Sequence, residues 1–389
     1  MKRILVSGIL LLVLTVYIFP SSSVYWHTAG QNPDQVYDIQ SIPAFPSTKI
    51  NDSGLSQTII FDYIGNDLDV FGCLEGEQGR IGFIIDKNSD QMLIDYIEDI
   101  TGKQINPVEF GILGAKKMDA VNLGMLISGM YINEYNHDDL TIYNNSDTDI
   151  SRVNIQPSVS LLLPGDVIFE ISPVLTVGSA LYEDNIVSRQ STTNIAYSIN
   201  SRIVQNLSGN IFQLSVLYNS KPLSYSQTVN ENTDEYENKK DSLNIGISSR
   251  IETFNYINTY FSFNYIKSDL YNNIVYSSGS QSESKTTSIV LPEVSLGFNV
   301  YINRHIELIF GTKGQWIDTV NELAPQMNPD VSTSSFNTEY RFGVRIVYNN
   351  FKCDIGLNKR HIALPFFIGG NTLTDNTFNV GVSYNGFEY

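Results

Sequence analysis

The chain has 389 residues, and its 23 tyrosines and 20 phenylalanines favour β-strands and membrane interfaces. Its hydrophobic content is 42% and its mean hydropathy is −0.10, values that exclude a bundle of membrane helices, because such helices need long unbroken apolar runs. The formal net charge of −17 argues against nucleic acid as a partner, since phosphate binding depends on an excess of Lys and Arg.

The first 23 residues follow the order of a secretory signal peptide. A basic pair at 2–3 precedes the apolar run 4–19, and small serines follow at 21–23. An uncleaved anchor helix is the alternative, because the run is close to the length that crosses a bilayer. We expect residues 1–23 to direct export of the chain.

Residues 24–55 contain Pro33, Pro43 and Pro46 and show no sustained hydrophobic period, so we expect irregular structure here. The segment would form either a lead-in outside the main fold or a plug inside it. The sequence does not favour one of these alternatives over the other.

From residue 56 onward, apolar and polar residues alternate with the period of two that is typical of half-buried strands. The pattern is weak up to residue 86 and strong from 108. We predict strands at 58–63, 68–74, 80–86, 108–113, 121–128, 153–163, 167–177, 195–203, 212–218, 243–252, 259–265, 290–300, 306–310, 336–348, 351–357 and 378–384.

The hairpin formed by 336–348 and 351–357 shows the pattern most clearly. Even-numbered positions of its first arm are mostly apolar, whereas the odd-numbered ones include Glu339, Arg341 and Arg345. The two asparagines between the arms tolerate the positive φ that a tight turn requires. One face of this hairpin is therefore apolar and the other is charged.

Short and long connections alternate as regularly as the side chains. The short ones are 164–166, 205–210, 254–257, 303–304 and 349–350, and the long ones are 132–149, 179–191, 219–241, 268–285, 316–335 and 359–376. This arrangement is typical of a closed antiparallel transmembrane β-barrel with short periplasmic turns and long extracellular loops. We predict an all-β fold of about 16 strands, or about 14 if the weak first pair lies outside the barrel.

Three prolines lie inside predicted strands: Pro157, Pro173 and Pro292. Each removes a backbone donor from a ladder that a closed barrel needs. We expect β-bulges or local kinks at these positions, where protein or lumen water can line the gap. The alternative is that a strand ends near each proline.

These features resemble a Gram-negative outer-membrane β-barrel of the porin-like kind. The resemblance rests on the export signal, the alternating connections and the aromatic C-terminus, and it covers residues 56–389. The chain is also loosely similar to the long-chain fatty-acid transporter barrels, in its number of strands and in the prolines within them. The resemblance implies an outer-membrane location in contact with lipid, and recognition by the barrel-insertion machinery through Phe387 and Tyr389.

The sequence contains little that points to catalysis. Its four histidines are scattered, and it has neither a phosphate-binding glycine loop nor a Cys/His set with metal-ligand spacing. Acidic clusters such as 138–139 and 234–235 fit solvated loop charge better than calcium sites. We therefore expect no enzyme activity, no metal and no cofactor.

Charged residues recur at positions that would face the lumen, and we predict that they line the pore. They are Glu170, Arg202, Arg250, Glu252, Glu293, Glu307, Glu339, Arg341, Arg345, Lys352 and Asp354. They would form either a selectivity zone for anionic solutes or a structural network in which Glu and Arg neutralise each other inside a plugged barrel. The sequence leaves both possibilities open.

Three functions are compatible with this architecture. The first is a channel or transporter that passes small solutes through a charged lumen. The second is a structural or interaction barrel with a plugged lumen and long acidic loops. The third is a transporter of hydrophobic molecules, which predicts an apolar pocket in the lumen and a lateral gap near Pro157 or Pro173.

Overall fold

The computed structural model describes residues 44–48, 56–64, 67–86, 108–136, 146–184, 187–254, 256–323, 331–360 and 376–386. The predicted signal peptide and the C-terminal aromatic residues Phe387 and Tyr389 lie outside these ranges. Within them no helix is long and apolar enough to cross a membrane.

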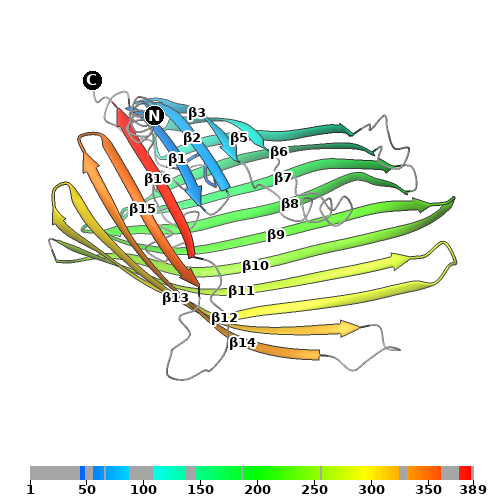
Figure 1. Cartoon of the computed structure of the whole chain (residues 1–389). Helices are drawn as coiled ribbons and strands as arrows, with labels where there is room; N and C mark the ends of the chain where they lie inside the picture. The colour runs from blue at the N-terminus through cyan, green and yellow to red at the C-terminus, as the bar shows by residue number, and fades with distance from the viewer. Residues whose placement is uncertain are drawn as a thin grey trace, which may run out of the picture.

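Sixteen antiparallel strands form one closed barrel (Figure 1). Each strand pairs with its neighbours in the sequence, and the first strand pairs with the last, so the wall has no free edge. The all-β barrel and its sixteen strands are confirmed, and the weak first pair belongs to the wall. The strands are β1 (Ser56–Ile64), β2 (Asp67–Gly76), β3 (Gly79–Asp86), β4 (Glu109–Met118), β5 (Val121–Asn136), β6 (Ser146–Leu163), β7 (Val167–Asp184), β8 (Val187–Leu207), β9 (Asn210–Val229), β10 (Asn232–Phe254), β11 (Ile257–Val275), β12 (Gln281–Asn303), β13 (Ile306–Leu323), β14 (Val331–Tyr348), β15 (Phe351–Arg360) and β16 (Asn376–Gly386).

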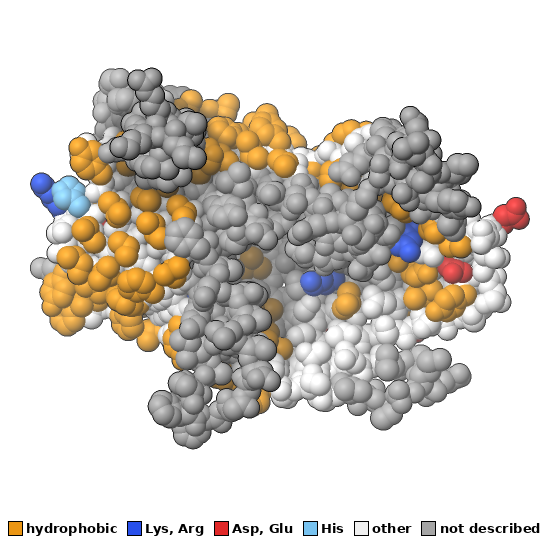
Figure 2. Space-filling model, in the orientation of Figure 1, with side chains coloured by type: hydrophobic (Ala, Val, Ile, Leu, Met, Phe, Trp, Pro, Cys, Tyr) orange, Lys and Arg blue, Asp and Glu red, His pale blue; other side chains and the backbone are white. Residues whose placement is uncertain are grey.

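The outer surface is apolar and the inner surface carries the charges. On β14, Phe336 is 61% exposed on the outside, whereas its neighbours of opposite parity, Arg341 and Arg345, are each only 8% exposed. Figure 2 shows hydrophobic side chains gathered over the left end of the barrel, whereas fewer of them are visible over the right end. An apolar belt around a closed wall is the surface that a bilayer requires, so this is a transmembrane barrel.

Strands on one side of the barrel are much longer than a membrane crossing needs. About 9–11 residues suffice for a transmembrane strand, but β10 and β12 have 23 residues each. In Figure 1 strands β8–β12 run far beyond β1, β2 and β16. The β9–β10 connection is only two residues, Asn230 and Glu231, both with the positive φ of a tight hairpin turn.

The predicted long connections 179–191, 219–241 and 268–285 are therefore mostly strand. The alternation is weak there because this part of the wall stands outside the apolar belt, where the outer face also carries many polar side chains. The predicted short turns are observed, and Asp166, Ser208 and Asn349 adopt positive φ in them.

The prolines interrupt the hydrogen-bond ladder as expected. Between β6 and β7, the pairs Ile155–Leu175 and Val159–Ile171 share one register, which places Pro157 directly opposite Pro173, yet the positions between these pairs are not bridged. Neither proline has an N–H to donate, so their meeting opens a gap in the ladder. On β12, a register shift between Val290 and Glu293 surrounds Pro292. The alternative of strand ends at these prolines is wrong.

Candidate functional site in the lumen

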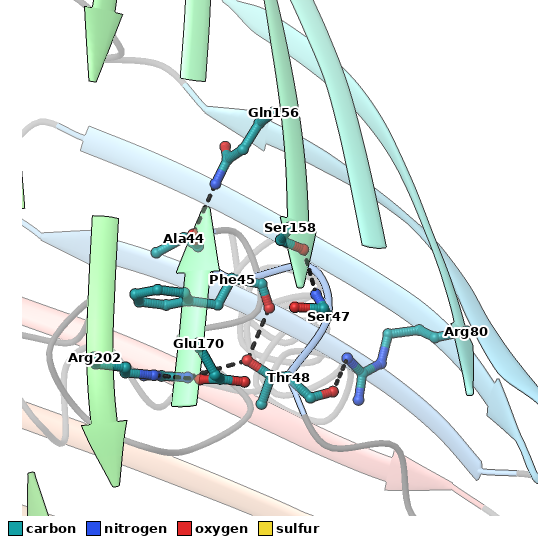
Figure 3. A network of polar contacts seen from close by, with 9 residues as sticks. All are labelled: Ala44, Phe45, Ser47, Thr48, Arg80, Gln156, Ser158, Glu170 and Arg202. Atoms are coloured by element: carbon teal, nitrogen blue, oxygen red, sulfur yellow. Dashed lines mark hydrogen bonds and ion pairs between the residues drawn. The ribbon is translucent and has the colours of Figure 1, made fainter. Parts of the chain in front are cut away.

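Residues 44–48 lie inside the barrel against the inner wall (Figure 3). Phe45 is 2% exposed, and Ser47 and Thr48 are buried as well. The segment is held as a turn, because the Thr48 amide donates to the Phe45 carbonyl at 2.9 Å and the Thr48 hydroxyl donates to the same oxygen at 2.8 Å. Three of the hydrogen bonds below join this short turn to strands more than a hundred residues away in the sequence.

Two side chains of β6 hold the backbone of the turn. Gln156 Nε2 donates to the Ala44 carbonyl at 2.7 Å, and Ser158 Oγ accepts from the Ser47 amide, also at 2.7 Å. On β3, Arg80 donates from a terminal guanidinium nitrogen to the Thr48 carbonyl at 3.2 Å. These bonds satisfy backbone groups that would otherwise be buried without partners.

Arg202 on β8 is the centre of the site. Its Nε donates to Glu170 Oε2 on β7 at 2.5 Å, and another of its nitrogens donates to Thr48 Oγ1 at 3.0 Å. Its guanidinium carbon lies 4.1 Å from the centroid of the Phe45 ring, within the range of a cation–π contact. One buried cation thus binds both the wall and the turn.

Gly124 on β5 provides the space that the turn occupies. A Cβ built at this position would lie 2.5 Å from the carbonyl carbon of Pro46 and would also collide with the Ser47 amide nitrogen. These are backbone atoms that cannot swing aside like the end of a side chain. Glycine is therefore required at Gly124 for the turn to lie this close to the wall.

Many of the inward-facing charges form ion pairs. Arg345 donates to both carboxylate oxygens of Asp354, at 2.6 and 2.8 Å. Further pairs are Arg80 with Glu75 at 2.5 Å, Arg341 with Glu339 at 2.6 Å, Lys313 with Glu293 at 2.9 Å, and Arg152 with Glu109. In the described part of the lumen, this pairing agrees with a neutralised network.

The structure brings only some of the predicted pore residues together. Glu170 and Arg202 meet at residues 44–48, whereas Glu339–Arg341 and Arg345–Asp354 form separate pairs on β14 and β15. Of the others, Glu293 is buried, Arg250, Glu307 and Lys352 are half-buried, and Glu252 is exposed.

Sequence reasoning missed Arg80, Gly124, Gln156 and Ser158. Arg80 pairs with Glu75 across the β2–β3 hairpin. Opposite charges at these two positions could have indicated the hairpin and its inner face, in a region where the alternation of apolar and polar residues is weak. The other three are small or uncharged residues of inward parity, and nothing in their spacing pointed to a bound segment.

Part of the inner wall is apolar, which simple alternation did not predict. One buried cluster contains Ile60, Phe71, Cys73, Leu113 and Leu126 on β1, β2, β4 and β5. A second contains Met130, Ile150, Ala180 and Leu223 on β5, β6, β7 and β9. The lumen therefore has apolar surface as well as paired charges.

The gap between β6 and β7 adjoins the turn. Gln156, which holds the Ala44 carbonyl, also donates to Ser172 Oγ at 3.0 Å, and Ser172 donates to the Pro157 carbonyl at 3.3 Å. Side chains of the inner face thus satisfy a carbonyl that the ladder left free. The same glutamine links the interrupted wall to the segment in the lumen.

No protein-family model matches the sequence, and no curated protein matches it. Among solved structures, the chain is similar to CdiB from Acinetobacter baumannii, with 8% identity and a TM-score of 0.47 over 87% of this chain and 60% of that one. It is also similar to the alcaligin outer membrane receptor FauA from Bordetella pertussis, with 7% identity and a TM-score of 0.41 over 87% and 76% of the two chains. A third similar structure is the toluene transporter TodX from Pseudomonas putida. It has 8% identity and a TM-score of 0.40 over 95% of this chain and 99% of that one. Such low identities and scores assign no function to the chain.

Proposed function

We propose that this outer-membrane β-barrel is a transporter for small solutes whose lumen is closed, at rest, by the turn at residues 44–48. The observation that carries the proposal is the position of this turn. It lies across the inner wall at the level of the buried Glu170–Arg202 pair, held by side chains of β3, β6 and β8.

The contacts are of a kind that can be exchanged. Between the described residues of the turn and the wall they consist of four hydrogen bonds and one cation–π contact, each individually weak because water or a solute can replace the partner. If the turn leaves, Arg80 and Arg202 lose their bonds to Thr48 and present donors to the lumen. That change would favour small anionic solutes.

Conductance in planar bilayers tests the proposal. The variant replaces Phe45 and Thr48 with glycine, which removes the contact of the Phe45 ring with Arg202 and both hydrogen bonds of the Thr48 hydroxyl without changing the wall. The full-length protein should conduct little, whereas the variant should open in steps and prefer chloride over potassium. Replacing the exposed serines 277, 278 and 280 with glycine is the matched control and should change nothing. Equal conductance of wild type and variant would refute closure by this segment.

A second candidate is a transporter of hydrophobic molecules that leave through the wall. The specific observation is the unbridged stretch where Pro157 faces Pro173. Outward-facing neighbours of this gap, Ile155 and Leu175, are apolar and exposed. Apolar clusters on the inner wall supply the other end of such a route.

A disulfide at the edge of the gap separates the two candidates. Ile155→Cys and Leu175→Cys lie directly opposite each other, in a background with Cys73→Ala and Cys353→Ala. If hydrophobic molecules use the gap, oxidation should block uptake of a hydrophobic fluorescent dye and reduction should restore it. Ion conductance of the glycine variant should not respond. A protein that neither conducts nor takes up dye in any variant would favour the structural barrel instead.

A further inference from the structure

A groove of about 960 Å³ lies on the outer surface of the barrel over β3, β4 and β5. This volume is within the range of roughly 300–1,000 Å³ that is typical of small-molecule sites. Most of the outward-facing side chains that line it are apolar and exposed, among them Ile81, Phe110, Ile112, Leu123, Met125 and Ile127. The groove is therefore continuous with the apolar belt that contacts the membrane.

Gly114 creates the depression. In the barrel register it lies between Ile81 on β3 and Met125 on β5, on the outer face. A Cβ added there would meet no atom within 4 Å. Where neighbouring strands present branched or long side chains, this position leaves empty space in the wall.

Lys116 lies at the end of the groove that is nearer the short turns. It is an exposed lining residue on the same face as Gly114, three residues before Asp119 in the β4–β5 turn. At about 3.3 Å per residue, it stands roughly 10 Å from that turn. Short turns face the periplasm, so this is the level of the headgroups of the inner leaflet. Lys116 forms no ion pair with any residue that the structure describes.

We propose that this groove binds one anionic phospholipid of the periplasmic leaflet, with an acyl chain over Gly114 and the phosphate at Lys116. The apolar lining fits an acyl chain, because a flexible chain can follow an uneven groove. A rigid strand of a second barrel would not fill it. Lys116, which has no ion-pair partner among the residues that the structure describes, places an ammonium at the depth of a lipid phosphate. This inference depends on the position of the barrel in the membrane and is independent of what the lumen transports.

Native mass spectrometry of the full-length protein in mild detergent tests the proposal, with palmitoyl-oleoyl-phosphatidylglycerol as the probe. The wild-type monomer should carry one lipid, and Gly114→Leu, which fills the depression, should lower its occupancy at least fivefold. Lys116→Gln should keep a lipid but lose the preference for phosphatidylglycerol over phosphatidylcholine. Leu214→Phe, at an outward position on β9, is the control for added bulk and should behave as wild type.

Folding is checked by the slower migration of the unfolded barrel in gels after heating. If Gly114→Leu does not fold, Met125→Trp narrows the same groove from its side and should give the same loss. Unchanged lipid occupancy in a folded groove variant would overturn the proposal. A lipid-free dimer whose formation depends on Gly114 would also overturn it, in favour of a second copy of the chain.

Discussion

Glu170 on β7 and Arg202 on β8 lie directly opposite each other and form an ion pair whose side chains are both 0% exposed. Removing two charges from water is costly, and only their mutual attraction and hydrogen bonds offset that cost. Each of these residues therefore depends on the other, and the turn at residues 44–48 depends on both.

Replacing Glu170 with glutamine should destabilise the barrel. Arg202 would remain buried without a countercharge, and breaking one side of a buried pair costs about 3–5 kcal/mol. Urea titration in lipid vesicles, followed by tryptophan fluorescence, measures the loss. The double variant Glu170→Leu with Arg202→Met removes both charges and should recover most of the stability. A single variant as stable as the wild type would contradict this account.

Replacing Gly124 with valine should expel the turn from the wall, because the new side chain would occupy the position of Pro46 and Ser47. We expect higher conductance in planar bilayers, similar to that of the glycine variant of the turn. Gly114→Val is the matched control, since a Cβ at Gly114 meets nothing within 4 Å. Opening by both variants would show that the effect is not specific to the turn.

Replacing Pro157 and Pro173 with valine should close the gap between β6 and β7. Two backbone N–H donors return to the ladder, and each new bond should add about 0.5–1.5 kcal/mol to the free energy of unfolding. Hydrogen exchange of residues 155–159 and 171–175 should slow. Pro222 lies in a continuous part of the β9–β10 ladder, so Pro222→Val should leave the exchange of β6 and β7 unchanged. Faster exchange in the double variant would argue that the gap is needed for packing.

Shortening the β9–β10 hairpin should leave the barrel intact. Residues 225–236 would be replaced by Asn-Gly, which joins Ser224 to its partner Glu237. The stacked pair Tyr225–Tyr236, with ring centroids 4.5 Å apart, is lost, but the removed part stands outside the apolar belt. Membrane insertion and heat-dependent gel mobility should match the wild type. In contrast, Ile247→Lys places a charge on the lipid-facing surface and should impair insertion.

The sequence predicted the part of the fold that the bilayer dictates. A strand with lipid on one side and polar lumen on the other must alternate, and the parts of β14 and β15 next to their shared turn were therefore recognised, whereas residues 331–335 and 358–360 were not. Outside the bilayer this constraint disappears. Residues 219–229 and 232–241 are strand, but polar side chains on both faces gave them the composition of a loop.

The lumen site was predictable only in part. Glu170 and Arg202 were recognised because both are charged residues at positions that the alternation of their strands assigns to the inner face. The turn that they hold has no period, and its contacts span 111 and 112 residues to Ser158 and Gln156. Nothing local in residues 44–48 specifies such partners, because the contact depends on the shape of the whole wall.

The unequal length of the strands has a consequence for the cell surface. β10 has 23 residues and β1 has 9, a difference of roughly 45 Å measured along the strand. Antibodies, phages or proteases that arrive from the medium would meet the crest formed by β8–β12 first, while the rim at β1 and β16 stays near the lipid. Immune or phage selection on this protein should therefore fall on one arc of its circumference.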